Sequence, residues 1–423
     1  MTELPATLDG MLQLIEQRAP QSRIEMGLER VERVRDRLAL RFDDTRIVSV
    51  AGTNGKGSTV AFLEAIACSA GLDAMAFTSP HLTSFGERFR FNRVALQDDE
   101  IVSALQTVER ARSDMPLTWF EYVTLAGFVL ASRLRPDWLI AEVGMGGRLD
   151  AVNAVDADAA VITSIGMDHQ RFLGRTRAAI AREKCGIARP GRPAIVAEKR
   201  PPAGMLDTLQ GVGAQVLLAG IDFDWRWRAG QLTVRVADRE FPAVSPGLTG
   251  RHQGGNAAAA ACAALALDPA LPDRIIVDGI AGAQLAGRFD RVARAPDIIV
   301  DVAHNPAAAR ALATELERLP GEKIAVFAAL EDKDIAGMVR PLARVFQHWF
   351  IATLEGPRGL RASELARRMR APAAGRSPDA LESVADALAA ARQACRPDQT
   401  IVVFGSFMTA AAALRALQQC KSD

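Results

Sequence analysis

A glycine-rich turn between a strand and a helix constrains the fold of this chain more than any other feature. The apolar run Ile47–Val50 leads into Gly52-Thr53-Asn54-Gly55-Lys56-Gly57-Ser58-Thr59, and residues 60–70 form a predicted helix that Gly71 ends. Glycines allow consecutive backbone N–H groups to point at one anion, and the positive end of the helix faces the same place. The segment therefore predicts a phosphate-binding loop, with every residue from Thr53 to Thr59 as a candidate ATP contact.

Two residues of this loop carry a predicted chemical role. Lys56 is placed to neutralise the charge of the terminal phosphates, and Ser58 offers a hydroxyl near a magnesium ion. Val50 occupies the first glycine position of the pattern G-x-x-x-x-G-K-[ST], and Gly57 separates Lys56 from Ser58. This departure weakens the match to kinases and GTPases. A glycine turn that binds no ligand is the alternative.

Chain length and the rhythm of strands and helices predict two α/β domains. The 423 residues exceed the roughly 250–300 at which a single core stops growing. Alternating strands and helices favour a mostly parallel sheet covered on both faces. We therefore predict a P-loop-containing, mostly parallel sheet domain over residues 1–286 and a smaller Rossmann-like α/β domain over residues 287–423. The predicted strands are 138–143, 160–165, 194–197, 298–302, 324–328, 349–352 and 401–404, and the other predicted helices are 7–18, 24–40, 99–112, 121–134, 176–184, 256–267, 307–318 and 380–394.

One segment of the first domain departs from the strand–helix rhythm. Residues 224–241 alternate apolar and polar side chains about Ala229-Gly230, which is typical of an antiparallel hairpin.

Composition indicates a soluble cytoplasmic protein with small-molecule partners. Lys and Arg number 51 and Asp and Glu 50, so no overall charge attracts nucleic acid or an anionic membrane. The five cysteines include no C-x-x-C pair, which argues for a reducing compartment. The first residues show no secretory signal pattern, and no run of about 18 apolar residues occurs.

Several motifs in order give the chain a family resemblance. GTNGKGST is followed by TSPHL, EVGMGGRLDA, MDH and EKCGI, and together they closely resemble the folylpolyglutamate synthase/dihydrofolate synthase family of the Mur ligase superfamily. The resemblance extends from the N-terminal helices to the C-terminal GSF. It implies a Mur ligase-like fold with an ATP- and folate-binding first domain and a glutamate-binding second domain. It also implies an ATP-dependent, amide-bond-forming ligase that adds L-glutamate to 7,8-dihydropteroate and to tetrahydrofolate through an acyl phosphate.

Three residues that follow strands are candidate metal ligands. Ser79, Glu142 and His169 stand at the carboxyl ends of strands, where side chains far apart in sequence converge beside the loop. Oxygen atoms are the ligands magnesium prefers. The resemblance implies two magnesium sites, the first held by Ser79 and Glu142 beside Ser58 and the second by His169. A histidine that caps a strand end and a buried glutamate without metal are the alternatives.

The resemblance also gives Lys184 a role in catalysis beside Lys56 and His169. Lys184 matches a family lysine that is carboxylated to a carbamate and helps to hold the second metal. A charged lysine at a helix end is the alternative.

Further residues match the family's substrate contacts. The resemblance assigns Asn256 to the nucleotide base, although asparagine is also a good helix N-cap. The pterin-bearing substrate is assigned Thr118, Phe120 and Asp150, and core packing is the alternative for Phe120. The segment 81–96 resembles the loop over the folate site. Arg288, Asp301 and His304 are assigned to the nucleotide, and Ser406 to the glutamate pocket.

Two other functions are weighed against the folate ligase. A Mur-type ligase of peptidoglycan precursors usually carries a separate N-terminal domain, whereas Gly52 lies near the start of this chain. A non-catalytic ATP-binding module does not need Lys56, Glu142, His169 and Lys184 together. We expect a monomer.

Overall fold

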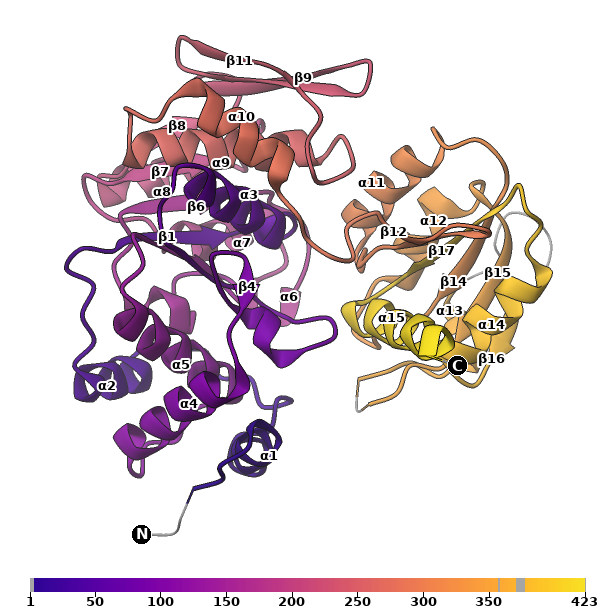
Figure 1. Ribbon diagram of the computed structural model, residues 1–423, viewed down its shortest axis with the longest axis horizontal. Coiled ribbons are helices and arrows are strands. Elements are labelled where there is room, and N and C mark those ends of the chain that lie inside the picture. The colour runs from indigo at the N-terminus through magenta and orange to yellow at the C-terminus, as the bar shows by residue number, and fades with distance from the viewer. Residues whose placement is uncertain (1–3, 357, 370–376, 423) are drawn as a thin grey trace. The chain divides into compact units, whose positions relative to one another are not determined.

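The chain folds into two compact units, which are described here one at a time. The computed structural model describes residues 4–356, 358–369 and 377–422. Unit 1 contains residues up to Ser79, Gly86–Gly247 and Gln253–Gln284, and unit 2 contains Pro80–Phe85, Leu248–His252 and the residues from Leu285 onward (Figure 1). Pro80–Phe85 and Leu248–His252 thus belong to unit 2, although both precede residue 286. A single boundary on the linear sequence cannot describe this division. The roles assigned to the two predicted domains stay predictions.

Unit 1 is built on a parallel sheet with an antiparallel edge. Among the described residues its order is β4-β3-β2-β5-β1-β6-β7-β8, in which β3 and β4 run antiparallel to their neighbours and the other pairs are parallel. The central strand is buried from Ile47 to Ala51, as expected for a strand covered on both faces. The strands are β1 (Arg46–Ala51), β2 (Ala74–Phe77), β3 (Phe89–Phe91), β4 (Val94–Ala95), β5 (Trp138–Glu142), β6 (Ala159–Ile162), β7 (Pro193–Val196) and β8 (Gln215–Leu218).

Helices cover both faces of this sheet. α3 packs against α9 and α10 on one face, and α4 packs on α5 at the other (Figure 1). The helices are α1 (Leu8–Arg18), α2 (Glu29–Leu38), α3 (Lys56–Ser69), α4 (Asp98–Arg112), α5 (Trp119–Leu134), α6 (Gln170–Leu173), α7 (Arg177–Cys185), α8 (Met205–Val212), α9 (Gln253–Leu267) and α10 (Asp273–Gly282), with short 3-10 turns η1 (Phe85–Arg88) and η2 (Ala151–Ala154).

The predicted hairpin is confirmed and belongs to a small separate sheet. In the described chain, β9 (Phe223–Arg228), β10 (Gln231–Val236) and β11 (Arg239–Val244) form an antiparallel sheet that packs on α9. Ala229 and Gly230 adopt positive φ angles of 48° and 79°, which is the tight-turn conformation the pair predicts.

Unit 2 is a second, smaller α/β sheet. Its order in the described part of the chain is β12-β13-β17-β14-β15-β16, parallel except for β12. Phe327, Phe346 and Phe404 stack in its core. The strands are β12 (Asp290–Ala293), β13 (Asp297–Val300), β14 (Lys323–Phe327), β15 (Phe346–Ala352), β16 (Asp379–Leu381) and β17 (Thr400–Phe404), and the helices are α11 (Pro306–Leu316), α12 (Ile335–Leu342), α13 (Ala362–Met369), α14 (Val384–Ala394) and α15 (Phe407–Ser422).

Several predicted boundaries are wrong. The helix predicted from residue 256 starts at Gln253, so Asn256 lies inside α9 and is not its N-cap, and the strand predicted to end at residue 165 ends at Ile162. The helix predicted from residue 24 starts at Glu29, and the one predicted from residue 380 starts at Val384, where the Ser383 side chain caps it. The helix after the loop starts at Lys56, not at Val60, so the second half of GTNGKGST is already helical. Propensity alone does not place such ends: the Ser383 side chain decides the start of α14, and the left-handed Gly55 decides that of α3.

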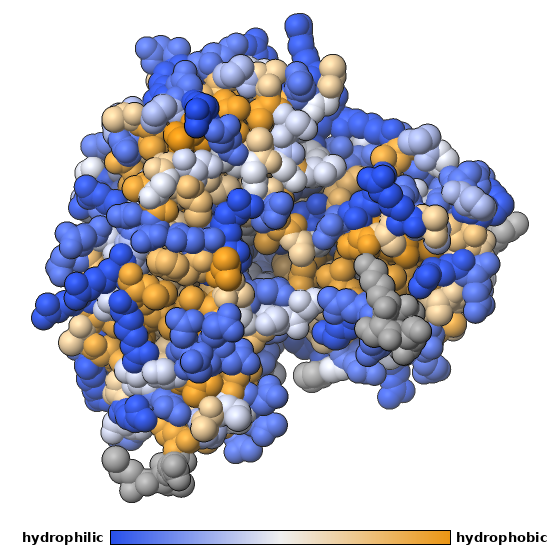
Figure 2. Space-filling model, in the orientation of Figure 1, coloured by the Kyte–Doolittle hydropathy of each residue, from blue (hydrophilic) through white to orange (hydrophobic). Residues whose placement is uncertain are grey.

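The described residues form no helix long and apolar enough to cross a membrane. Hydrophilic residues dominate the face in Figure 2, with apolar residues in scattered patches.

Candidate active site

The glycine-rich loop joins β1 to α3 and is held by the residues that follow β6. The backbone N–H of Thr53 donates to the Ser164 carbonyl at 2.7 Å, and that of Asn54 donates to the Ser164 hydroxyl at 3.1 Å. The Thr163 hydroxyl donates to the Asn54 carbonyl at 2.8 Å. Sequence reasoning missed Thr163 and Ser164, whose only signal is a pair of hydroxyls directly after a strand. Residues that directly follow β6 therefore hold the backbone of the loop at Thr53 and Asn54.

The loop glycines are required by space as well as by backbone angle. A Cβ on Gly52 would lie 1.7 Å from the Thr163 hydroxyl oxygen, and one on Gly55 would lie 2.3 Å from Asn256 Oδ1. Gly55 also has a φ of 91°, where side chains are strained. The loop thus packs directly against the asparagine on α9.

Both predicted catalytic lysines reach the same carbonyl group. Lys184 Nζ donates to the Gly52 carbonyl at 2.8 Å, and Lys56 Nζ donates to it at 3.3 Å. Lys56 Nζ also lies 4.0 Å from Glu142 Oε1, while the Ser79 backbone N–H donates to Glu142 Oε2 at 3.1 Å. The side chains of Lys56, Glu142 and Lys184 and the backbone of Ser79, remote in sequence, are thereby collected at the carboxyl edge of the unit 1 sheet.

Burial makes Lys184 unusual among lysines. It is 4% exposed, and burial, reinforced by the nearby charge of Lys56, lowers its pKa to about 7. A large share of this amine is therefore neutral at physiological pH.

Asp150 is a second buried titratable group of this region. Its carboxylate accepts hydrogen bonds from the backbone N–H groups of Met145 at 2.8 Å and Val152 at 3.0 Å. Burial raises its pKa to about 6, against the opposing effect of those hydrogen bonds. The group is ionised at neutral pH but titrates unusually close to it.

The aromatic candidate Phe120 packs against the turn after β5. A Cβ on Gly144 would lie 2.5 Å from the Phe120 ring, and the ring centroid is 6.2 Å from that of Phe77. The Thr118 side chain instead accepts from the Glu121 N–H at 3.4 Å, so it caps α5.

Arg88 is a residue of this region that sequence reasoning did not single out. It is 5% exposed, and its guanidinium carbon lies 4.9 Å from the Trp119 ring centroid. Burial lowers its pKa to about 10, although the charges of Glu142 and Glu87 oppose that shift. Its signal in the sequence was its position between Phe85 and Phe89 in the segment 81–96.

Asn256 has a buried partner that was also missed. Its Nδ2 donates to Gln253 Oε1 at 2.8 Å, at the start of α9. Gln253 is fully buried, and its Nε2 has no hydrogen-bond partner among the described residues. The hydroxyl of Thr59, also fully buried, likewise lacks a partner within the described chain. Such orphaned polar atoms fit a loop that binds a polar ligand.

The predicted metal ligands differ in their surroundings. Ser58, Ser79 and Glu142 offer the hard oxygen atoms that fit magnesium. His169 has a φ of 48° at the start of α6, and its backbone N–H donates to Asp168 Oδ1 at 2.9 Å. No cluster of three or more His, Cys, Asp or Glu side chains suited to a metal occurs in the described residues.

The remaining predicted residues lie in unit 2. The Arg288 guanidinium carbon is 5.1 Å from the Phe407 ring centroid, and the His304 ring is 5.9 Å from the same ring. Asp301 accepts from the N–H groups of Phe289 and Ala303 at 2.9 and 2.8 Å.

The Ser406 hydroxyl is already engaged within unit 2. It lies 2.7 Å from Thr409 Oγ1 and accepts from the Thr409 N–H at 3.0 Å. It therefore supports the start of α15, and its predicted contact with glutamate stays a prediction.

Comparison with known proteins decides the family. Residues 50–264 match the Mur ligase middle domain, and residues 287–407 match the Mur ligase glutamate ligase domain. The dihydrofolate synthase/folylpolyglutamate synthase of Escherichia coli K12 is 40% identical over 408 residues, which cover 94% of this chain and 93% of that protein. The chain belongs to the dihydrofolate synthase/folylpolyglutamate synthase family.

Solved structures of this dihydrofolate synthase/folylpolyglutamate synthase family have the same fold. E. coli FolC in complex with DHPP and ADP aligns with a TM-score of 0.93 at 37% identity and covers all of both chains. A bifunctional family member with Mn, AMPPNP and L-glutamate bound aligns with a TM-score of 0.91 at 36% identity, over 98% of this chain and 100% of that one.

Membership in the dihydrofolate synthase/folylpolyglutamate synthase family confirms the predicted resemblance, the Mur ligase-like α/β fold and the class of ATP-dependent ligase. The roles given to individual residues stay predictions.

Proposed function

We propose that the protein uses ATP to add L-glutamate to dihydropteroate, giving dihydrofolate, and to tetrahydrofolate, extending its glutamate tail. The observation that carries this proposal is the gathering of Lys56, Glu142 and Lys184 at the phosphate loop of a family member. The relatives whose structures hold ADP with DHPP, or AMPPNP with Mn and L-glutamate, support the same substrate classes. We also propose that it acts as a monomer.

The chemistry has two bond-forming steps. The substrate carboxylate, a benzoate-type group in dihydropteroate, attacks the γ-phosphorus of ATP, an O–P bond forms, and ADP leaves. The amine of L-glutamate then attacks the acyl carbon, loses a proton, and inorganic phosphate leaves. Catalysis of phosphoryl transfer is mostly positioning and charge stabilisation. Lys56 is placed to hold negative charge on the transferred group, and the loop backbone holds the phosphates.

Divalent metal would neutralise the charge of the phosphates when bound. Ser58, Ser79 and Glu142 would hold a first ion, and His169 with a carboxylated Lys184 a second. The lowered pKa of Lys184 supports the carboxylation, since only a neutral amine adds to carbon dioxide. Asn256, Arg288, Asp301 and His304 are proposed contacts of the nucleotide, and Ser406 of glutamate, in a glutamate-binding domain at residues 287–423.

The proposed function is tested by ADP formation with purified protein. Turnover should require L-glutamate together with either dihydropteroate or tetrahydrofolate. If no ADP forms with either dihydropteroate or tetrahydrofolate, the proposal is overturned. If ADP forms with only one of them, the activity toward the other is removed from the proposal. Light scattering of the same sample tests the monomer.

Asp150 predicts a pH dependence for the pteroate substrate. Its pKa of about 6 means that the carboxylate, the form that accepts hydrogen bonds from a pterin, is lost as pH falls through that value. We expect the KM for dihydropteroate to rise roughly tenfold for each pH unit below about pH 6. Asp150→Asn should raise this KM at every pH and abolish its pH dependence. A wild-type KM that stays constant down to pH 5 would contradict the assignment.

Gly144 predicts a way to displace Phe120 without changing it. An alanine Cβ at Gly144 would lie 2.5 Å from the ring, whereas a Cβ at Gly211 on α8 meets nothing within 4 Å. We expect Gly144→Ala to raise the KM for dihydropteroate about tenfold, since misplaced substrate contacts commonly cost that much or more. Gly211→Ala is the control and should behave as wild type. Equal KM values for Gly144→Ala and wild type would show that Phe120 contributes to packing and not to substrate binding.

A further inference from the structure

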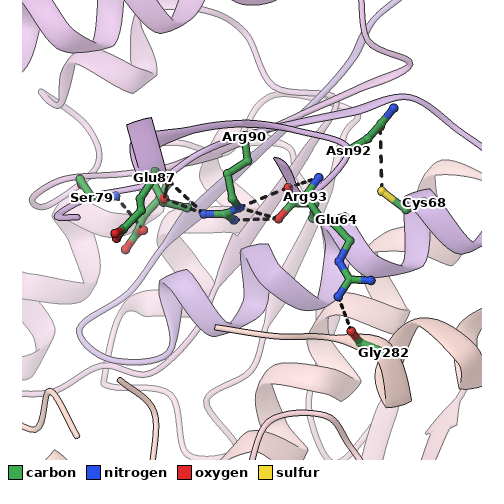
Figure 3. A network of polar contacts seen from close by, with 10 residues as sticks. Glu64, Cys68, Ser79, Glu87, Arg90, Asn92, Arg93 and Gly282 are labelled. Atoms are coloured by element: carbon green, nitrogen blue, oxygen red, sulfur yellow. Dashed lines mark hydrogen bonds and ion pairs between the residues drawn. The ribbon is translucent and has the colours of Figure 1, made fainter. Parts of the chain in front are cut away.

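A nearly buried ion pair braces the helix that begins at the phosphate loop. Glu64 on α3 is 3% exposed, and its Oε2 accepts from Arg90 Nη2 at 2.7 Å and Nε at 3.0 Å. Glu64 Oε1 accepts from the Arg93 backbone N–H at 3.1 Å, in the turn between β3 and β4. One carboxylate thus ties α3 to the side chain of β3 and to the turn that follows it (Figure 3).

The other side of the Arg90 guanidinium holds both ends of a loop. Its Nη1 donates to the Thr78 hydroxyl at 3.2 Å and to the Glu87 carbonyl at 3.1 Å. The Thr78 hydroxyl in turn donates to the Glu87 carbonyl at 3.1 Å. Figure 3 shows the guanidinium between Glu64 and Glu87. Thr78 and Glu87, which flank the segment from Ser79 to Gly86, are therefore both hydrogen-bonded to one arginine.

These contacts close a ring that returns to Lys56. Ser79 directly follows Thr78, its N–H donates to Glu142 Oε2, and Glu142 Oε1 lies 4.0 Å from Lys56 Nζ. Lys56 starts α3, and Glu64 lies roughly two helical turns further along it. The rigid helix and the ion pair together set the separation between Ser79 and the loop lysine.

We propose that Arg90, held by Glu64, is a positioning residue that places Ser79 and Glu142 for the divalent metal and the phosphates. The assignment of Ser79 and Glu142 as metal ligands rests on the proposed function. Arg90 does so through Thr78 and Glu87. A planar guanidinium with donors on two sides spans acceptors that a single ammonium group does not. Outer partners of this kind typically change metal affinity by about 10–100-fold when they are lost.

Four variants separate positioning from simple stability. Arg90→Met removes the guanidinium donors and leaves the buried Glu64 carboxylate without a cationic partner, so it should also lower the thermal midpoint. Glu64→Met/Arg90→Met removes both buried charges and should recover most of the stability, as replaced ion pairs often do. Arg90→Lys should lie between Arg90→Met and wild type. Arg112→Met is the control: it removes the arginine of a pair of similar burial, in which the Arg112 and Glu109 side chains are 14% and 8% exposed against 15% and 4% for Arg90 and Glu64. Glu109 keeps its contacts with Arg18 and the Tyr122 hydroxyl.

The decisive measurement is binding of Mn²⁺ to each variant in the presence of AMPPNP, followed by electron paramagnetic resonance. We expect the double variant, although folded, to bind Mn²⁺ at least about tenfold more weakly than wild type. Arg112→Met should lose stability and keep wild-type affinity. The Mn²⁺ concentration for half-maximal ADP formation should shift by the same factor as the binding constant.

Two outcomes would overturn the inference: wild-type Mn²⁺ affinity in the folded double variant, or the same loss of affinity in Arg112→Met. The titration contains neither folate nor glutamate, so it decides the role of Arg90 independently of the ligase reaction. The wild type could form no ADP with either dihydropteroate or tetrahydrofolate while the double variant binds Mn²⁺ more weakly. That combination would support the positioning role of Arg90 and overturn only the proposed function.

Discussion

Lys56→Met is expected to lower kcat for ADP formation by about 10²–10³-fold, the usual cost of removing one group that stabilises charge in the transition state. Lys56 Nζ lies within 4.0 Å of Glu142 and donates to the Gly52 carbonyl at 3.3 Å, so it sits where loop and carboxylate meet. Methionine keeps the length of the side chain and removes its charge. The loop backbone still binds phosphate, so the affinity for ADP should fall much less than kcat.

Lys199→Met is the control for this variant. Lys199 is a surface lysine of unit 1 whose side chain is 43% exposed and pairs with Asp224. It should keep wild-type kcat. Equal kcat for Lys56→Met and wild type, with both proteins folded, would show that the loop lysine has no part in phosphoryl transfer.

Lys184→Ala is expected to lower kcat by a similar factor, about 10²–10³-fold, and to recover part of it with short carboxylic acids that replace the lost carbamate oxygens. Lys184→Arg tests the same point without a cavity, because guanidinium is always charged and forms no carbamate. Bicarbonate labelled with ¹³C should give a carbamate signal in wild type and none in Lys184→Arg. A fully active Lys184→Arg would contradict the carboxylation.

The pKa of Lys184 sets the direction of the pH effect. Because the pKa of Lys184 is about 7, the fraction of neutral amine falls as pH decreases below that value. The ¹³C carbamate signal should therefore weaken below pH 7 and strengthen above it. The unmodified lysine also affects stability. Between that value and the ordinary 10.5, the unfolded chain holds more protons than the fold, so the free energy of unfolding should rise with pH over this window. A signal that grows as pH falls would be incompatible with an amine of lowered pKa.

Features that depend on neighbours in sequence were predicted well. The glycine spacing around Lys56 and the strand before it specify a loop whose backbone N–H groups converge, because only short-range geometry is involved. Alternation of β-strands with helices likewise specified a mostly parallel sheet with a second α/β domain. The motifs that follow Phe77, Ala141 and Ile162 predicted which strand ends are followed by polar groups, since parallel strands end at one edge.

Properties of the site that depend on remote neighbours required the tertiary structure. The lowered pKa of Lys184 and the raised pKa of Asp150 follow from burial, which their own flanking residues do not reveal. Thr118 and Ser406 match substrate positions by motif, yet in the fold their side chains accept hydrogen bonds from backbone N–H groups at the starts of α5 and α15. Propensity predicts a cap or a ligand equally for such residues.

The phosphate loop itself shows where the division lies. By itself, the sequence determined that residues 52–59 turn between a strand and a helix and that Lys56 belongs to them, because a run of glycines and one lysine carry that information locally. Only the tertiary structure decided what surrounds the loop: Thr163 and Ser164 hold its backbone, and Asn256 packs against Gly55. Glu64 and Arg90 brace its helix through contacts 26 residues apart in sequence. Side-chain contacts of that range are set by packing of the whole sheet, which no local pattern records.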